Sequence, residues 1–306
     1  MIIFNGDQLA QKIEKDLKQK VAQLRKGESK LKIVAILFEE DLGSQIYTQL
    51  KGEAAKRVGI DYEVFEFSMT DSPEEVVEKI KTLNQDEAVT GIIIQKPWRQ
   101  TWVKIKGIDQ MKGQKAVRQA FNAWWQFLTT QISLKKDVDG LHPETLTTIK
   151  ANLWQQQGKV LPATAQAVMV ILDQAFEKLK INKTKQKKLQ IMILGRSDIV
   201  GQPVFHELKN QGFQAKILTK DDVEQRLKSG KKLTDADVII SATGVSHLVF
   251  GEMIKEGVIL IDVGEPRPDI DLASVKDKAA FITPVPGGVG PMTVVSLLKN
   301  CVTIAA

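Results

Sequence analysis

The chain alternates strand-like and helical patterns along most of its length, and this alternation restricts the folds open to it. In the first half, these patterns follow one another at residues 32–38 (strand), 44–58 (helix), 62–67 (strand), from Ser72 onward (helix) and 89–94 (strand). A βαβαβ series of this kind predicts a parallel sheet with helical crossovers. We therefore expect an N-terminal α/β domain.

A second series of the same type begins near residue 189. Strand-like runs lie at 189–194, 215–218, 238–241 and 258–263, and a helical pattern covers 198–210. This order is typical of a Rossmann-like nucleotide-binding domain. We predict domains at residues 1–155 and 156–289 with a cleft between them. We also expect a C-terminal helix at 290–306 to pack back on the first domain.

The composition is that of a globular protein without a membrane span. The 306 residues are 43% apolar and 26% charged, and no apolar run approaches the roughly 20 residues that cross a bilayer. The N-terminal segment has neither the basic start nor the apolar core of a signal peptide. Cys301 is the only cysteine, so an intrachain disulfide and a cysteine zinc cluster are excluded. These features predict a cytoplasmic protein.

Neither nucleic acid nor metal is indicated. The net charge is +6, but the 43 basic and 37 acidic residues are mostly interspersed. The densest basic stretch, 178–188, contains no aromatic residue and is typical of a solvated loop before a strand. The three histidines, His142, His206 and His247, are far apart and share no metal-ligand spacing. We expect no nucleic-acid partner and no metal.

A glycine-containing motif follows the first strand of the second series, at residues 193–203. Gly195 permits a tight turn, Ser197 can cap the next helix so that its amides face an anion, and Gly201 lets that helix approach the sheet. The motif departs from GxGxxG, so a strand–helix joint without a ligand is the alternative. The pair Thr243-Gly244 follows a later strand, at the edge where open α/β sheets bind ligands.

The tip of the next strand decides between NAD and NADP. NAD-binding proteins usually have an acid there, for the ribose hydroxyl. In this chain Lys220, together with Arg196 from the first loop, is suited to a 2′-phosphate. Asp221 and Asp222 either bind the ribose or simply begin the next helix. The sequence favours NADP, with NAD as the alternative.

The first domain carries the candidate catalytic residues. Tyr47 and Lys51 lie four positions apart, on one face of the predicted helix. A lysine beside a tyrosine can act in proton transfer, although an exposed lysine lying over the ring is the simpler alternative. The strand at 89–94 ends on Gln95. Asp139 either forms a turn or directs a carboxylate at the amino group of a ligand.

A run of prolines and glycines precedes the C-terminal segment, at residues 282–293. Three glycines and three prolines in this run exclude a helix interior and a central strand. The run predicts one shaped backbone surface, with an elaborate turn before the last helix as the simpler alternative.

Together, and in this order, these motifs resemble the methylenetetrahydrofolate dehydrogenase/cyclohydrolase family. The resemblance runs from about Gly6 to Asn300. The matching segments are 44–47 with Lys51, 91–95, 136–143, 195–203, 241–244, 261–264 and the run at 282–293.

The resemblance implies a bifunctional enzyme of one-carbon metabolism. Such an enzyme oxidises 5,10-methylenetetrahydrofolate with NADP and hydrolyses the methenyl product to 10-formyltetrahydrofolate, which serves purine biosynthesis. The resemblance implies Lys51 as the key catalytic residue, with Tyr47 and Gln95 as its partners. It implies Asp139 as the anchor of the pterin ring.

The resemblance also implies the remaining site residues and a homodimer formed through the nucleotide domain. The loop at 282–293 would face folate and cofactor, with Gly288, Pro291 and Thr293 binding substrate beside Tyr47. The cofactor-binding residues expected are Gly195, Arg196, Ser197, Gly201, Lys220, Thr243, Gly244 and Glu265.

Four features depart from the family pattern. Lys96 stands where leucine is usual, and a second cation near the catalytic lysine would lower its pKa. Pro162-Ala163-Thr164-Ala165 replaces Pro-Cys-Thr-Pro, and Glu265 stands where an apolar residue is usual. The segment 98–135 is longer than in family members, and its aromatic residues form either local core or a lid or partner surface. A monofunctional dehydrogenase and a decayed nucleotide-binding regulatory protein are therefore alternatives.

Overall fold

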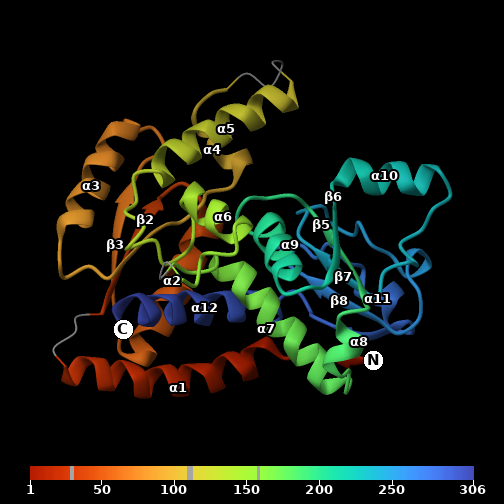
Figure 1. Cartoon of the computed structure of the whole chain (residues 1–306). Helices are drawn as coiled ribbons and strands as arrows, with labels where there is room; N and C mark the ends of the chain where they lie inside the picture. Colours follow the sequence, from red (N-terminus) through yellow and green to blue (C-terminus); the bar gives the residue numbers. More distant parts are fainter. Residues whose placement is uncertain (28–30, 109–112, 157–158) are drawn as a thin grey trace. The chain divides into compact units, whose positions relative to one another are not determined.

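The computed structural model describes residues 1–27, 31–108, 113–156 and 159–306. The chain forms two compact units (Figure 1), and the two-domain α/β fold with parallel sheets predicted from the sequence is confirmed. Unit 1 comprises Met1–Lys12, Leu146–Trp154 and Leu161–Ser296, whereas unit 2 comprises Ile13–Thr145, Gln155–Val160 and Leu297–Ala306. The limits given above for the two domains stay a prediction.

Among the described residues, unit 2 contains a three-stranded parallel sheet with the order β3–β2–β4. Its strands are β2 (Lys32–Phe38), β3 (Asp61–Phe67) and β4 (Gly91–Ile94). All three lie where the apolar runs predicted strands. Ile33 of β2 pairs with both Tyr62 and Gly91, which fixes the register across the sheet.

The helices of unit 2 begin and end at residues suited to those positions. They are α2 (Leu42–Val58), α3 (Pro73–Gln85), α4 (Arg99–Ile105) and α5 (Gln114–Thr129). Asp41 caps α2, and Gly59 ends it with φ +88°, a left-handed conformation that favours glycine. Ser72 caps α3 and Pro73 occupies its first turn.

The segment after β4 contributes to the core of unit 2. One face of the sheet, including Val34 and Ile36, packs with α3, α4 and α5. Helices α4 and α5 lie side by side (Figure 1). Trp102, Phe121 and Trp125 are buried in this cluster. These aromatic residues therefore form local core, which was one of the two alternatives for the segment.

Unit 1 contains a six-stranded parallel sheet among the described residues, with the order β1–β9–β8–β7–β5–β6. Its strands are β1 (Ile2–Ile3), β5 (Gln190–Leu194), β6 (Gln214–Leu218), β7 (Val238–Ser241), β8 (Val258–Asp262) and β9 (Ala279–Ile282). Four of these match the predicted runs. Strands β1 and β9, which pair with each other, were not predicted.

The helical elements of unit 1 are α7 (Ala163–Lys178), α8 (Lys183–Gln186), α9 (Gly201–Asn210), α10 (Lys220–Lys228), the short 3-10 helix η2 (Gly251–Met253) and α11 (Leu272–Val275). Helix α9 contacts β5 and β6, as a crossover helix between parallel strands does. Residues of both units occur in α1 (Gly6–Lys26), α6 (Pro143–Lys150) and α12 (Val289–Ala305). Within the described ranges, no helix has both the length and the apolar character needed to cross a bilayer.

Candidate active site

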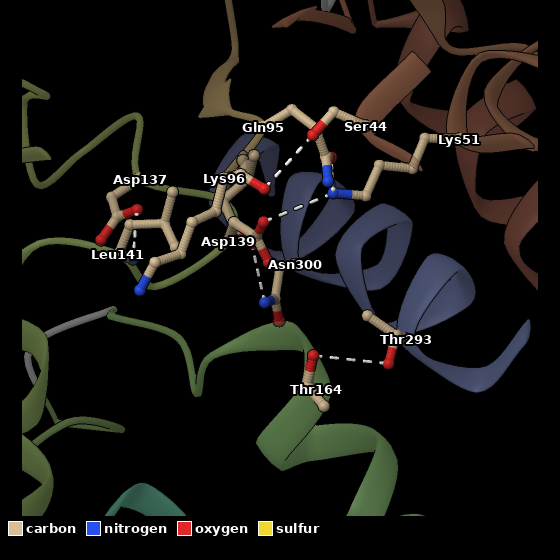
Figure 2. A network of polar contacts seen from close by, with 11 residues as sticks. Ser44, Lys51, Gln95, Lys96, Asp137, Asp139, Leu141, Thr164, Thr293 and Asn300 are labelled. Carbon is tan, nitrogen blue, oxygen red and sulfur yellow. Dashed lines mark hydrogen bonds and ion pairs between the residues drawn. The ribbon is translucent and has the colours of Figure 1, made fainter. Parts of the chain in front are cut away.

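Lys51 is a buried cation of unit 2. It lies on the inward face of α2 with only 6% of its surface exposed. Its Nζ donates a hydrogen bond of 3.0 Å to Oε1 of Gln95 (Figure 2). Gln95 directly follows β4, and its backbone amide donates to the carbonyl of Ile36 at 2.8 Å. The sheet therefore fixes the position of the amide group that Lys51 contacts.

Asp139 supplies the charge opposite Lys51. Its Oδ2 lies 3.5 Å from the Lys51 ammonium nitrogen, and the two side chains are 16% and 7% exposed. Because both side chains are largely shielded from solvent, each charge is stabilised mainly by the other and by neighbouring polar groups. The carboxylate of Asp139 is thus directed at the Lys51–Gln95 pair rather than used to form the local turn.

The turn itself is held by Asp137. This buried carboxylate accepts hydrogen bonds from the amides of Leu141 and His142, both at 2.9 Å, and from Thr145 Oγ1 at 3.1 Å. Burial raises the pKa of Asp137 above its usual value. The sequence left open which role an acid would play here, and the structure gives the structural role to Asp137.

Asn300 of α12 is a further support that the sequence analysis missed. Its Nδ2 donates to the carbonyl of Val138 at 2.9 Å, and the side chain is buried (Figure 2). Asn300 therefore holds the residue immediately before Asp139. An amide side chain within a mostly apolar C-terminal helix was the available signal.

The nucleotide motif in unit 1 requires glycine at two positions. A Cβ on Gly195, whose φ is +109°, would lie 2.3 Å from the carbonyl oxygen of Ala242. A Cβ on Gly201 would lie 2.0 Å from the carbonyl oxygen of Gly195. Helix α9 begins at Gly201, later than the predicted 198, and Ser197 Oγ accepts a hydrogen bond of 3.3 Å from the Gly201 amide. The loop thus packs closely against the backbone at Ala242, and α9 packs closely on the loop.

Two buried carboxylates hold the neighbouring loops, and the sequence analysis missed both. Oδ2 of Asp269, which is fully buried, accepts from Ser241 Oγ at 2.8 Å and from the Thr243 amide at 2.7 Å. Asp262 accepts from the amides of Gly264 and Ile270, both at 2.8 Å. Desolvation raises the pKa of Asp262 to about 6. These acids fix the loop of Thr243 and Gly244 and the loop of Gly264 and Glu265.

One of the two acids at the tip of β6, Asp222, is used to cap a helix. Asp222 Oδ2 accepts hydrogen bonds from the amide and hydroxyl of Thr219, both at 2.7 Å, in a reciprocal capping box at the start of α10. These bonds, together with the positive charge of Arg196, lower the pKa of Asp222. Of the two alternatives for this segment, the structure supports a helix start. Arg196 and Lys220 are both exposed.

The loop at 282–293 is shaped by close backbone contacts. The amide of Gly6 donates to the carbonyl of Gly287 at 2.9 Å, and a Cβ on Gly6 would lie 2.1 Å from the carbonyl oxygen of Gly288. A Cβ on Gly288 would lie 2.4 Å from the carbonyl oxygen of Pro284. The loop is thus a packed surface and not a loose turn.

Comparison with known proteins identifies both halves of the chain. Residues 4–119 match the catalytic domain of tetrahydrofolate dehydrogenase/cyclohydrolase, and residues 162–306 match its NAD(P)-binding domain. The chain belongs to the tetrahydrofolate dehydrogenase/cyclohydrolase family. The family predicted from the motifs is confirmed.

Relatives of this family member match along nearly the whole chain. "Bifunctional protein FolD" of Exiguobacterium is 32% identical, covering 100% of this chain and 99% of that protein. FolD of Staphylococcus saprophyticus is 34% identical, covering 97% and 94%. The solved structure of bifunctional FolD from Campylobacter jejuni has a TM-score of 0.80 at 30% identity, covering 98% and 97%. The Trypanosoma brucei enzyme, complexed with NADP and an inhibitor, has a TM-score of 0.80 at 28% identity, covering 99% and 97%.

The structure shows where three departures from the family pattern lie. The Lys96 ammonium lies over the rings of Phe121 and Trp125, 5.6 and 5.1 Å from their centroids. The Lys96 side chain extends away from Lys51 (Figure 2). The second cation is therefore directed at α5 and not at Lys51. Ala163 and Ala165 are fully buried in α7, where small residues pack closely.

The last departure is Glu265. Desolvation raises the pKa of its carboxyl group to about 7, although the residue as a whole remains exposed.

Among the described residues, no group of three or more His, Cys, Asp or Glu side chains is arranged to hold a metal ion.

Proposed function

We infer that this protein oxidises 5,10-methylenetetrahydrofolate to 5,10-methenyltetrahydrofolate with NADP and hydrolyses the product to 10-formyltetrahydrofolate. The observation that carries the inference is the buried contact of Lys51 with Gln95 and Asp139, within a chain that matches both domains of the family. The full-length relatives with bifunctional names support both activities over a dehydrogenase alone. The retained Lys51, Gln95 and Asp139 argue against a decayed regulatory protein.

We propose that Lys51 is the general acid and base of the hydrolytic step. The methenyl group is an electrophilic cation that water attacks, and each proton that leaves or arrives needs a carrier. The Lys51 ammonium is held by Gln95 Oε1 at 3.0 Å, which fixes its direction. Tyr47 lies one turn earlier on α2, half-buried, and shares the catalytic role. The contribution of the protein is the orientation of these groups.

We propose that Asp139 anchors the pterin ring. A carboxylate accepts two hydrogen bonds from an aminopyrimidine edge, and such charge-assisted bonds are short and strong. Asp137 and Asn300 hold the backbone on either side of Asp139, so its carboxylate needs little reordering when substrate binds. Gly288, Pro291 and Thr293 bind the substrate from the loop and the start of α12. Thr293 Oγ1 lies 3.5 Å from Thr164 Oγ1, which orients its hydroxyl.

The residues of unit 1 fit a dinucleotide. The close packing at Gly195 and Gly201 clears the space above the loop for a pyrophosphate, and Ser197 lies beside the first amide of α9. Arg196 and Lys220 are suited to the 2′-phosphate of NADP, and one of the two nearby acids, Asp222, is engaged in capping α10. Thr243, Gly244 and Glu265 lie on the loops that follow β7 and β8. When bound, the nicotinamide ring accepts the hydride from the folate.

We also propose that the protein is a cytoplasmic homodimer. Its single cysteine, Cys301, is buried and free, which suits a reducing compartment. Light scattering coupled to size-exclusion chromatography measures the mass in solution, and a mass of one chain would contradict the dimer.

A spectrophotometric assay tests the function. The purified protein is given 5,10-methylenetetrahydrofolate with NADP or NAD, and both the reduced cofactor and the methenyl intermediate are followed by their absorbance. A bifunctional enzyme produces reduced cofactor without lasting accumulation of methenyltetrahydrofolate. Accumulation of that intermediate would indicate a monofunctional dehydrogenase, and no reduction of either cofactor would contradict the proposal.

A further inference from the structure

We propose that Asp41 and the inserted helices α4 and α5 form a positioning device that holds Lys51 against Gln95. The inference rests on the catalytic roles proposed for Lys51 and Gln95. Asp41 links the elements of this device, because its side chain accepts hydrogen bonds from both α2 and α4.

Asp41 is almost completely buried, with 2% of its surface exposed. Its Oδ2 accepts hydrogen bonds from the backbone amide of Ser44 at 3.2 Å and from the Ser44 hydroxyl. These bonds cap α2, the helix that carries Lys51. Its Oδ1 accepts a hydrogen bond of 2.9 Å from Thr101 Oγ1 of α4. The two oxygens of one carboxylate thus join the catalytic helix to the inserted segment.

The segment that follows Gln95 is held at the same place. The backbone amide of Trp98 lies 3.3 Å from Asp41 Oδ2, and the Ser44 hydroxyl lies 3.3 Å from the Lys96 carbonyl (Figure 2). The Trp98 indole packs so closely on Gly43 that a Cβ there would lie 3.2 Å from its Nε1. The first turn of α2 is therefore clamped to the residues immediately after Gln95.

The inserted helices secure the other end of this segment. The Lys96 ammonium lies over the rings of Phe121 and Trp125 of α5, at distances where a cation is attracted by aromatic rings. Trp102 of α4 packs edge-on against Phe121, with ring centroids 5.4 Å apart. The backbone from Lys96 to Trp102 is thus fixed to the core on one side and to Asp41 on the other.

The consequence is a fixed separation between two groups that act together. Lys51 is on α2 and Gln95 is at the end of β4, so a shift of α2 along the sheet changes their 3.0 Å contact directly. Misplacement of a catalytic group by about 1 Å can reduce a rate roughly a hundredfold. The loss of one hydrogen bond from the clamp should have a smaller effect, of about three- to tenfold.

The test is Thr101→Val, which removes the bond to Asp41 and retains a branched side chain. Thr130→Val is the matched control, because the Thr130 hydroxyl donates only within the last turn of α5, to Gln126 O at 2.9 Å or Phe127 O at 3.0 Å. Thr101→Ser keeps the hydroxyl and is the rescue variant. Each variant is measured for kcat and KM of methenyltetrahydrofolate hydrolysis across pH, for NADP binding and for Tm.

We expect Thr101→Val to lower kcat about three- to tenfold with KM and NADP binding near wild type, and Thr101→Ser to restore kcat. Thr130→Val should keep the wild-type kcat. Equal kcat in Thr101→Val and Thr130→Val, or a loss that Thr101→Ser does not restore, overturns the positioning role. Lys51→Met separates this inference from the proposed function. If Lys51→Met abolishes hydrolysis and Thr101→Val has no effect, only the positioning role fails. If Lys51→Met still hydrolyses substrate, the proposed catalytic role fails.

Discussion

The ammonium group of Lys51 lies 3.5 Å from the carboxylate of Asp139, although the two residues belong to distant parts of the sequence. The sequence assigned them separate tasks, catalysis for the lysine and pterin binding for the aspartate. Under the roles proposed for these two residues, a pterin bound to Asp139 would also be placed beside Lys51. The contact would then join the binding step to the proton-transfer step in one largely buried site.

Lys51→Met should abolish methenyl hydrolysis while cofactor affinity stays near wild type. Methionine has a similar length but no ionisable group that could transfer a proton. The control is Lys56→Met, which removes an exposed lysine from the same helix. Hydrolysis is followed by the decay of methenyl absorbance, and NADP binding by fluorescence titration. Hydrolysis at the wild-type rate in Lys51→Met would rule out the assigned role.

Asp139→Asn should weaken folate binding and leave nucleotide binding unchanged. The asparagine carbonyl replaces only one of the two acceptor oxygens and carries no charge. Loss of a charge-assisted hydrogen bond costs about 1.5–3 kcal/mol, or roughly ten- to hundredfold in affinity. Isothermal titration with folate and with NADP measures both effects. Parallel loss of both affinities would indicate misfolding rather than loss of an anchor.

The sequence predicted the elements that local rules determine. Strand β2 and the C-terminal end of α2 lie where the apolar pattern and Gly59 placed them. The sequence also identified Lys51, Gln95 and Asp139 as candidates, with Gln95 as a partner of Lys51. It did not predict the ion pair of Lys51 with Asp139, because that contact depends on how distant segments fold together.

The elements missed were short or depended on remote partners. Strand β1 has only two residues, too few to show the alternation of apolar and polar residues that identifies a strand. It forms because it pairs with β9. Asp41, Asp262 and Asp269 were overlooked for a related reason. Nothing in the sequence around these acids shows which buried hydroxyl and amide groups donate hydrogen bonds to them. Only the structure shows those donors.

Tyr62→Phe should increase the free energy of unfolding by about 1–2 kcal/mol. The Tyr62 hydroxyl oxygen is buried and has no hydrogen-bond partner among the described residues, so its removal relieves a desolvation cost. Burial, together with the charge of Asp139, also raises the pKa of Tyr62, which keeps the group neutral.

Urea denaturation at neutral pH measures the change. Tyr62→Leu is the control for packing, because the Tyr62 ring lies against Gly52 and its loss should destabilise the protein. A less stable Tyr62→Phe protein would show that the hydroxyl is bonded in solution.

NADP affinity should depend on the ionisation of Glu265. The pKa of this carboxyl group is raised from 4.5 to about 7, so it is mostly neutral below pH 7 and charged above. A carboxylate near the 2′-phosphate repels it, so NADP binding should weaken as the pH rises through 7. Glu265→Gln removes this repulsion, whereas the 2′-phosphate itself titrates equally with both proteins. The difference between the two pH profiles of NADP affinity therefore reports on Glu265 alone. Identical pH profiles would place Glu265 away from the phosphate.

The cofactor preference should be ionic in origin. If Arg196 and Lys220 hold the 2′-phosphate, NADP binds more tightly than NAD, and the gap shrinks at high salt because exposed charges are screened. Lys220→Ala should weaken NADP binding far more than NAD binding. Lys228→Ala is the control, because it removes an exposed lysine from the other end of α10.

Titration of NADP and NAD at low and high ionic strength distinguishes the effect of Arg196 and Lys220 from that of Glu265. The capping box of Thr219 and Asp222 already engages one of the two acids that would otherwise bind a ribose hydroxyl. A salt-independent preference for NAD would show instead that Glu265 governs the site, and that Arg196 and Lys220 serve only the solvated surface.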